Sequence, residues 1–174
     1  AQEFRYGLMA ALPLSDVSSR SRILKFLAGT ADPNIAPRLL RWQFDPESDA
    51  DVRGLAARAV EKLSGGEVSV ATPTDASELL TQRGASLLKT ASGRFASIRE
   101  SAIVTELTSR DVRGELLNDA TSHLTDAVAL DATNSRASCL LLVAKSAATD
   151  PALSVAASGA AGQTVPDLAA ALES

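Results

Sequence analysis

A chain of 174 residues is long enough to bury a hydrophobic core, because a domain of about 150 residues hides roughly 70% of its unfolded surface. Its 45% hydrophobic and 22% charged residues are typical of a soluble globular domain and argue against disorder. The formal net charge of −4 argues against a sequence-independent nucleic-acid binder, and no apolar run reaches the roughly 18–20 residues of a membrane span.

Leucine and alanine dominate the apolar residues, whereas only 3% of all residues are aromatic. Alanine, leucine and arginine are among the strongest helix formers. The sequence therefore predicts an all-α fold, an array or irregular bundle of about eight short helices, with an α-solenoid arrangement as an alternative.

The first block of the chain, residues 1–66, contains three predicted helices joined by tight turns. Apolar residues from Val17 onward predict a helix that ends at Gly29. The Asp-Pro dipeptide at residues 32–33 predicts the next helix, because aspartate caps a helix and proline fits its first position. That helix should end near Phe44, just before a second Asp-Pro dipeptide.

The third helix has the clearest pattern, between residues 48 and 66. We expect Ser48 to cap its amino end, and Gly65 or Gly66 to end it in the left-handed conformation. Its apolar residues recur with the helical period that lines one face: Val52, Leu55, Ala56, Ala59, Val60 and Leu63.

Residues 67–74 change character, with two valines among polar residues, and they are predicted to be a linker. The second block, residues 75–174, begins with Asp75 and Glu78 at capping-box spacing, ahead of a helix over residues 76–90. We expect the two blocks to form one compact domain.

Further helices are predicted along the second block. Gly93 should separate the first helix from the next, over residues 95–107, and a long helix follows over residues 111–130. The apolar run at residues 135–148 predicts the most completely buried helix. An Ala-rich helix and a final helical turn are predicted beyond Asp150.

The tetrapeptide Asp-Val-Arg-Gly occurs twice, at residues 51–54 and 111–114, each time at the front of a predicted helix. At the same offset, four residues between Leu27 and Ala36 match residues between Leu87 and Ala96. A duplicated three-helix unit and a chance match in an Ala- and Arg-rich chain both explain this similarity, and both stay open.

The stretch at residues 51–63, DVRGLAARAVEKL, resembles the second helix of a HEAT-type repeat, in which an Asp-x-Val-Arg-like opening precedes an Ala-rich amphipathic helix. With residues 32–44 as the first helix of the pair, the resemblance covers residues 32–63. It implies an α-solenoid, in which at least three such units normally stack. The following segments depart from the family, since they do not return at its period of about 40 residues.

Few residues could support catalysis or metal binding. A Cys/His nucleophile would need Cys139 beside His123, yet Cys139 lies in an apolar run where a thiol behaves as a small hydrophobe. We expect His123 to be a partly exposed helix residue near Asp126. No glycine-rich segment has the spacing of a phosphate-binding loop. We therefore predict no catalytic residue, no metal site and no cofactor.

Basic and aromatic residues gather in the first block. If its first two helices pack antiparallel, these side chains form one patch on an otherwise acidic protein, and arginine and tryptophan are enriched at interface hot spots. A solvated helix face with Trp42 partly buried in the core is the alternative. The predicted partner-binding residues are Arg20, Arg22, Lys25, Arg38, Arg41 and Trp42.

These observations favour a non-catalytic protein-binding or structural subunit of a larger assembly, with protein partners and no nucleic acid. A helical bundle that binds a small ligand or pigment near Leu116, Leu140 and Val143 is the alternative, and an enzyme is favoured least. The first residue is alanine, so we expect either a processed organellar or exported protein or an excised fragment of a cytoplasmic one. A place at the periphery of a membrane complex is compatible with either.

Overall fold

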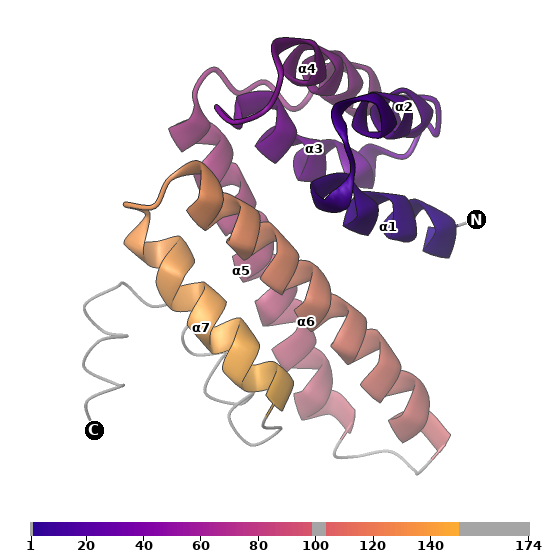
Figure 1. The fold of residues 1–174 in the computed structure, drawn as a ribbon. Coiled ribbons are helices and arrows are strands. Elements are labelled where there is room, and N and C mark those ends of the chain that lie inside the picture. Colours follow the sequence, from indigo (N-terminus) through magenta and orange to yellow (C-terminus); the bar gives the residue numbers. More distant parts are fainter. Residues whose placement is uncertain (1, 99–103, 150–174) are drawn as a thin grey trace. The chain divides into compact units, whose positions relative to one another are not determined.

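The computed structural model describes residues 2–98 and 104–149, and these residues form helices and connecting turns with no strand (Figure 1). The predicted all-α fold is confirmed for this part of the chain. Its α-helices are α1 (Gln2–Ala11), α2 (Val17–Ala28), α3 (Ala36–Phe44), α4 (Ala50–Ser64), α5 (Pro73–Ile98), α6 (Val104–Leu130) and α7 (Ser135–Thr149), and its 3₁₀ helices are η1 (Leu12–Leu14) and η2 (Pro33–Ile35).

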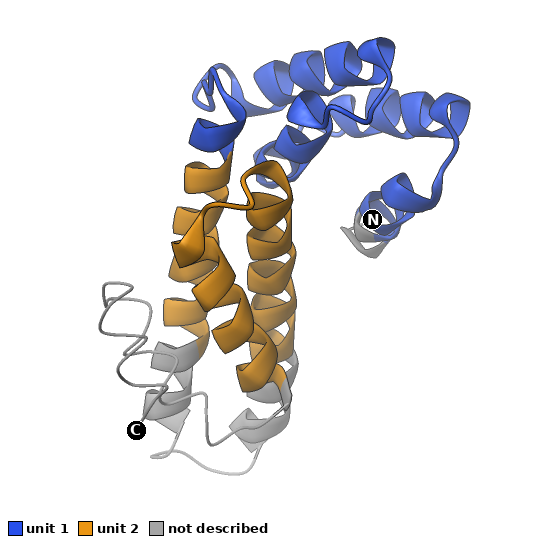
Figure 2. Cartoon of the chain, turned by 60° about the vertical axis from the view of Figure 1, so that its left-hand side comes forward, with its two compact units in different colours: residues 1–76 blue, residues 77–174 orange. Residues whose placement is uncertain are grey.

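The chain divides into two compact units, Ala1–Ala76 and Ser77–Ser174, which we call unit 1 and unit 2 (Figure 2). The division falls inside α5, which begins in unit 1 and continues through unit 2. Residues 67–72, within the expected linker, lie outside the helices, and α5 starts at Pro73.

Unit 1 is an array of short helices in which α2 and α3 both pack against α4. Its helix ends follow the local sequence. Asp16 accepts a hydrogen bond from the Ser19 backbone N at 2.7 Å and caps α2, and Asp32 caps η2 in the same way through Asn34. Gly65 ends α4 with φ of 61°, as expected of a glycine in the left-handed region. The core of unit 1 includes Leu24, Leu27, Leu39, Leu40, Val52, Ala56 and Val60.

The predicted Ser48 cap of α4 is wrong. Asp49 occupies the cap position, and its carboxylate accepts from the Asp51 backbone N at 2.8 Å. Ser48 is buried one residue earlier, and its hydroxyl donates to Asp45 at 2.8 Å. The serine therefore closes the turn between α3 and α4, and Arg53 donates to its carbonyl oxygen at 2.9 Å.

Residues 32–63 form η2, α3 and α4, and α3 packs against α4 as a helical pair. A relation of this pair to HEAT-type repeats stays a prediction. The two Asp-Val-Arg-Gly copies differ in position, because residues 51–54 open α4 whereas residues 111–114 lie inside α6. The matching segments also differ, since the first one includes a helix end and the second lies within α5.

Unit 2 contains most of α5, with α6 and α7 beside it (Figures 1 and 2). The predicted break at Gly93 is wrong, because α5 runs through it to Ile98. The predicted capping box is also misplaced. Thr72 and Asp75 form it instead, since each backbone N donates to the other side chain at 3.1 Å.

Gly84 also stays inside α5, and its reason is packing. A Cβ atom at this position would lie 2.6 Å from the Leu124 Cγ atom of α6, so only glycine allows this close approach of the two helices. The loss of helix propensity, about 1 kcal/mol relative to alanine, is offset by burial of the leucine against the α5 backbone.

Helix α7 is less completely buried than predicted. It buries one stripe, Ala137, Leu140, Ala144 and Ala147, while Leu142 is 62% exposed. A continuous apolar run places apolar side chains on every face of a helix, but only one face of α7 packs against the core. The segments predicted beyond Asp150, and residues 99–103 of the predicted helix over residues 95–107, lie outside the described residues.

Candidate functional site

Trp42 lies in the core of unit 1 with two arginines on its ring. Its side chain is 6% exposed. The guanidinium carbon of Arg20, from α2, lies 4.7 Å from the centroid of the indole ring, and that of Arg41, from α3, lies 5.7 Å from it. Both distances allow cation–π attraction. The structure therefore brings together three of the six predicted partner-binding residues.

Arg20 also binds the connection between α1 and α2. Its Nε donates to the Leu12 carbonyl at 3.1 Å, and its Nη2 donates to the Ser15 carbonyl at 2.9 Å. The Leu12 carbonyl, in η1, also accepts from the Ser15 backbone N at 3.3 Å, and the Ser15 carbonyl lies directly after η1. Arg20 thus connects Trp42 on α3 to the turn between α1 and α2. We call this set of contacts the Arg20–Trp42 joint.

Arg22 and Lys25 do not belong to this cluster. Residues two apart on a helix point in nearly opposite directions, so Arg22 cannot share the face of Arg20. Both Arg22 and Lys25 are exposed. Arg38 is half-buried on α3, one turn before Trp42. The single predicted patch is therefore divided into a largely buried arginine–tryptophan cluster and an exposed basic pair on α2.

Beside the basic pair lies an exposed aromatic pair that the sequence reasoning missed. The rings of Phe4, from α1, and Phe26, from α2, meet edge to face with centroids 5.7 Å apart. Phe4 is 61% exposed and Phe26 is 49% exposed. We name the exposed surface formed by Phe4, Phe26, Arg22 and Lys25 the α1–α2 surface.

The exposed position of Phe26 follows from the helical period of α2. Leu24 and Leu27 are three apart and both buried, so they define the core face of α2. Phe26 is two residues after Leu24 and therefore points away from that face. The placement of Phe4 beside it had no sequence signal, because it depends on how α1 folds back at η1.

Two contacts hold the start of α1 near the end of α2. Arg5 donates to the Asp32 carboxylate at 3.0 Å, and Phe4 contacts Phe26. At the other end of α1, the fully buried Leu12 anchors η1 in the core. The aromatic pair is therefore positioned from both ends of α1.

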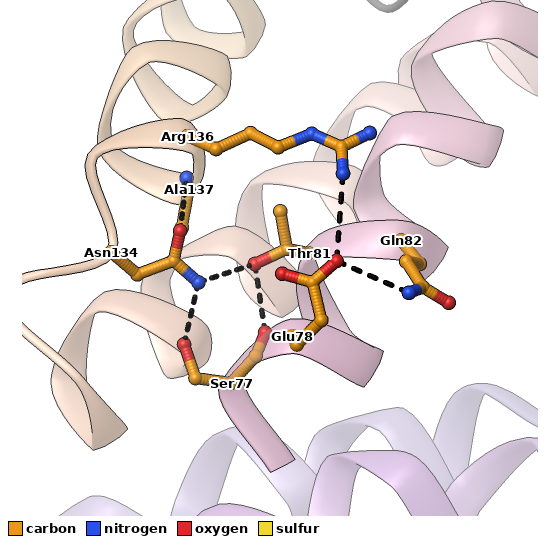
Figure 3. Close-up of polar contacts among 7 residues, drawn as sticks. All are labelled: Ser77, Glu78, Thr81, Gln82, Asn134, Arg136 and Ala137. Atoms are coloured by element: carbon orange, nitrogen blue, oxygen red, sulfur yellow. Dashed lines mark hydrogen bonds and ion pairs between the residues drawn. The ribbon is translucent and has the colours of Figure 1, made fainter. Parts of the chain in front are cut away.

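Unit 2 contains a polar cluster between α5 and α7 (Figure 3). The Asn134 amide donates to Ser77 Oγ at 2.9 Å and to Thr81 Oγ1 at 3.1 Å, while its oxygen accepts from the Ala137 backbone N at 2.9 Å. Ser77 in turn donates to the Ala127 carbonyl at 2.8 Å. Asn134 therefore caps α7 and joins it to α5, which is a structural role.

The residues considered for chemistry lie in unit 2. His123 is 7% exposed, so the expectation of a partly exposed residue is wrong, because it shares the core face of α6 with Ala120 and Ala127. Cys139 is half-buried on α7. In the described part of the chain no cluster of three or more His, Cys, Asp or Glu side chains could hold a metal ion.

The positions expected to line a ligand pocket are packed together. Leu140 is 1% exposed within the core of unit 2, and Leu116 and Val143 pack against that core. Among the helices described over residues 2–98 and 104–149, none has the length and apolar content to cross a membrane. Comparisons of the chain with family models, curated proteins and solved structures found no match.

Proposed function

We propose that this chain is a non-catalytic protein-binding subunit of a larger assembly, and that it binds through the α1–α2 surface. The observation that carries the proposal is the exposed, edge-to-face pair of Phe4 and Phe26. Aromatic residues and arginine are enriched in protein interfaces, and adjacent exposed apolar side chains mark interaction sites more often than isolated ones do.

The contribution of Phe4 and Phe26 to folding stability explains their pairing less well than binding does. An aromatic pair contributes about 0.5–1.5 kcal/mol beyond its buried area, and here about half of each ring stays in water. A partner that covers both rings would gain the remaining burial, at roughly 25 cal/mol per Å² of apolar surface. The surface is also positioned in advance, by Arg5, Leu12 and the Arg20–Trp42 joint, which lowers the entropy cost of binding.

The test is native mass spectrometry of the tagged full chain purified from its source under mild conditions. The wild-type chain should retain a partner, and a variant with Phe4→Ser and Phe26→Ser should lose most of it while keeping its helical circular dichroism. The matched control replaces Leu14 and Leu142, which are 89% and 62% exposed, with serine. Equal loss in the control, or unchanged retention in the phenylalanine variant, would refute the proposed binding surface.

A further inference from the structure

We infer that the α1–α2 surface binds an acidic amphipathic helix of a partner protein. This inference rests on the proposed function and adds the chemistry of the partner. Its first support is local charge, because residues 20–44 contain five cations, Arg20, Arg22, Lys25, Arg38 and Arg41, and one acid, Asp32, in a chain of net charge −4.

The charges in this segment are not equally available. Arg20 lies on the Trp42 ring and donates to backbone carbonyls, and the Asp32 carboxylate accepts from Arg5. Arg22 and Lys25 are exposed, and α2 itself contains no acidic residue, although the carboxylate of its cap, Asp16, attracts Arg22 electrostatically. Neither forms an ion pair with another residue of the described ranges. Both cations are therefore accessible to the carboxylates of a partner.

The basic pair and the aromatic pair form one continuous surface. Arg22 is four residues before Phe26 and three before Lys25 on α2, so it is a neighbour of both on the exposed face. Phe4 extends the apolar area onto α1. A ligand that fits this surface needs an apolar stripe over the two rings and carboxylates along one edge.

A helix provides that arrangement, with apolar residues at every third and fourth position and acidic residues on the flank. The described part of unit 1 has no strand edge on which an extended peptide could form backbone hydrogen bonds. Recognition through side chains alone favours a partner whose backbone hydrogen bonds are already satisfied.

An anionic membrane is the weaker match for the same surface. Recognition of acidic lipids typically uses clusters of about 4–8 lysines and arginines. Here two exposed cations flank the aromatic pair, and the whole chain carries a net charge of −4. Two carboxylates at fixed positions on a helix need no larger cluster, since each can pair with one cation.

The experiment uses two fluorescein-labelled helical peptides of about 15 residues, the shortest length at which isolated helices are reasonably stable. Both carry the same leucine stripe, and one has glutamates on the flanks where the other has lysines. Fluorescence anisotropy with the full chain should show about tenfold tighter binding of the acidic peptide at low salt, and the difference should shrink as salt screens the charges.

Charge reversal locates the effect. The Arg22→Glu and Lys25→Glu double variant should reverse the order of the two peptides. The control, Arg83→Glu with Lys89→Glu, makes the same change of net charge at exposed positions of α5 and should leave the order unchanged. Equal affinity of both peptides for the wild-type chain, or equal effects of the two double variants, would overturn the inference.

The outcomes separate this inference from the proposed function. If the phenylalanine variant loses the native partner but neither peptide discriminates by charge, the chain binds protein through this surface and the acidic-helix inference alone fails. A sedimentation assay with phosphatidylserine vesicles provides the membrane arm. Binding to vesicles that requires Phe26, without binding to the acidic peptide, would replace the inference with a membrane-surface role.

Discussion

The two units of this chain end and pack their helices in different ways. Unit 1 contains α-helices of 9 to 15 residues, and it leaves an aromatic pair in water. Asp16 and Asp49 cap the starts of α2 and α4, and Gly65 ends α4. In unit 2, α6 has 27 residues and joins α5 and α7 around a core of leucine and alanine. Local sequence thus places helix ends in unit 1, whereas in unit 2 a contact between two helices, Gly84 with Leu124, accounts for a glycine inside α5.

The largest expected effect tests the arginine–tryptophan joint of unit 1. Trp42→Ala should lower the free energy of unfolding by about 3–5 kcal/mol, because it removes a buried ring and leaves a cavity beneath Arg20. Leu142→Ala, at an exposed position of unit 2, should change it by less than about 0.5 kcal/mol. Urea unfolding of the two variants measures this difference. Similar changes in the free energy of unfolding would contradict a structural role for Trp42.

The next effect concerns the helix contact in unit 2. Gly84→Ala should destabilise the protein by about 1–3 kcal/mol, because the new methyl group overlaps Leu124. Gly114→Ala is the matched change, since no atom lies within 4 Å of its new Cβ, and it should stabilise α6 by about 0.5–1 kcal/mol. Thermal unfolding of both variants gives the signs. A stabilising Gly84→Ala would mean that the close contact of α5 with α6 is incorrect.

A smaller effect is expected at the polar cluster of unit 2. Asn134→Ala removes the cap of α7 and the hydrogen bonds to Ser77 and Thr81, which should cost about 1–2 kcal/mol. Asn118→Ala, at an exposed position of α6, should stay within about 0.5 kcal/mol of the wild type. Denaturant midpoints compare the two, and an Asn134 variant as stable as the Asn118 variant would show that the network contributes nothing.

The smallest effect is acid sensitivity at one carboxylate in each unit. The backbone N of Ser19 lowers the pKa of Asp16, and the hydroxyl of Thr133 lowers the pKa of Asp131. A carboxylate whose pKa is lower in the folded state stabilises the fold at pH values above its pKa in the unfolded chain, about 3.9. This stabilisation is lost as the pH falls through the pKa of the folded state. Carbon-detected NMR titration should place both midpoints below 3.8, the ordinary value for this group. Midpoints at or above it would contradict the two hydrogen bonds.

Local chemistry was sufficient to predict much of unit 1. The Asp-Pro start at residues 32–33, the end of α3 at Phe44 and the left-handed Gly65 all act within a few residues, so the sequence contains their causes. The predicted break at Gly93 is wrong, and the reason for a glycine at Gly84 could not be predicted, because the contact comes from Leu124, forty residues later. Long-range packing of this kind has no signature in a single sequence.

The candidate site was predicted only in part, for a similar reason. The expected patch included Arg20, Arg41 and Trp42, and the structure places the guanidinium groups of Arg20 and Arg41 over the Trp42 ring. The exposed position of Phe26 follows from its spacing to Leu24 and could have been predicted. Phe4 could not, because its position depends on the η1 turn and on the ion pair of Arg5 with Asp32.

The most direct test of the account is hydrogen–deuterium exchange of the full chain, free and bound to the partner that co-purifies with it. Binding through the α1–α2 surface should slow exchange in the peptides that cover Gln2–Ala11 and Val17–Ala28, with α6 and α7 unchanged. Protection confined to α6 and α7, with α1 and α2 exchanging as in the free chain, would contradict the proposed location of the interface.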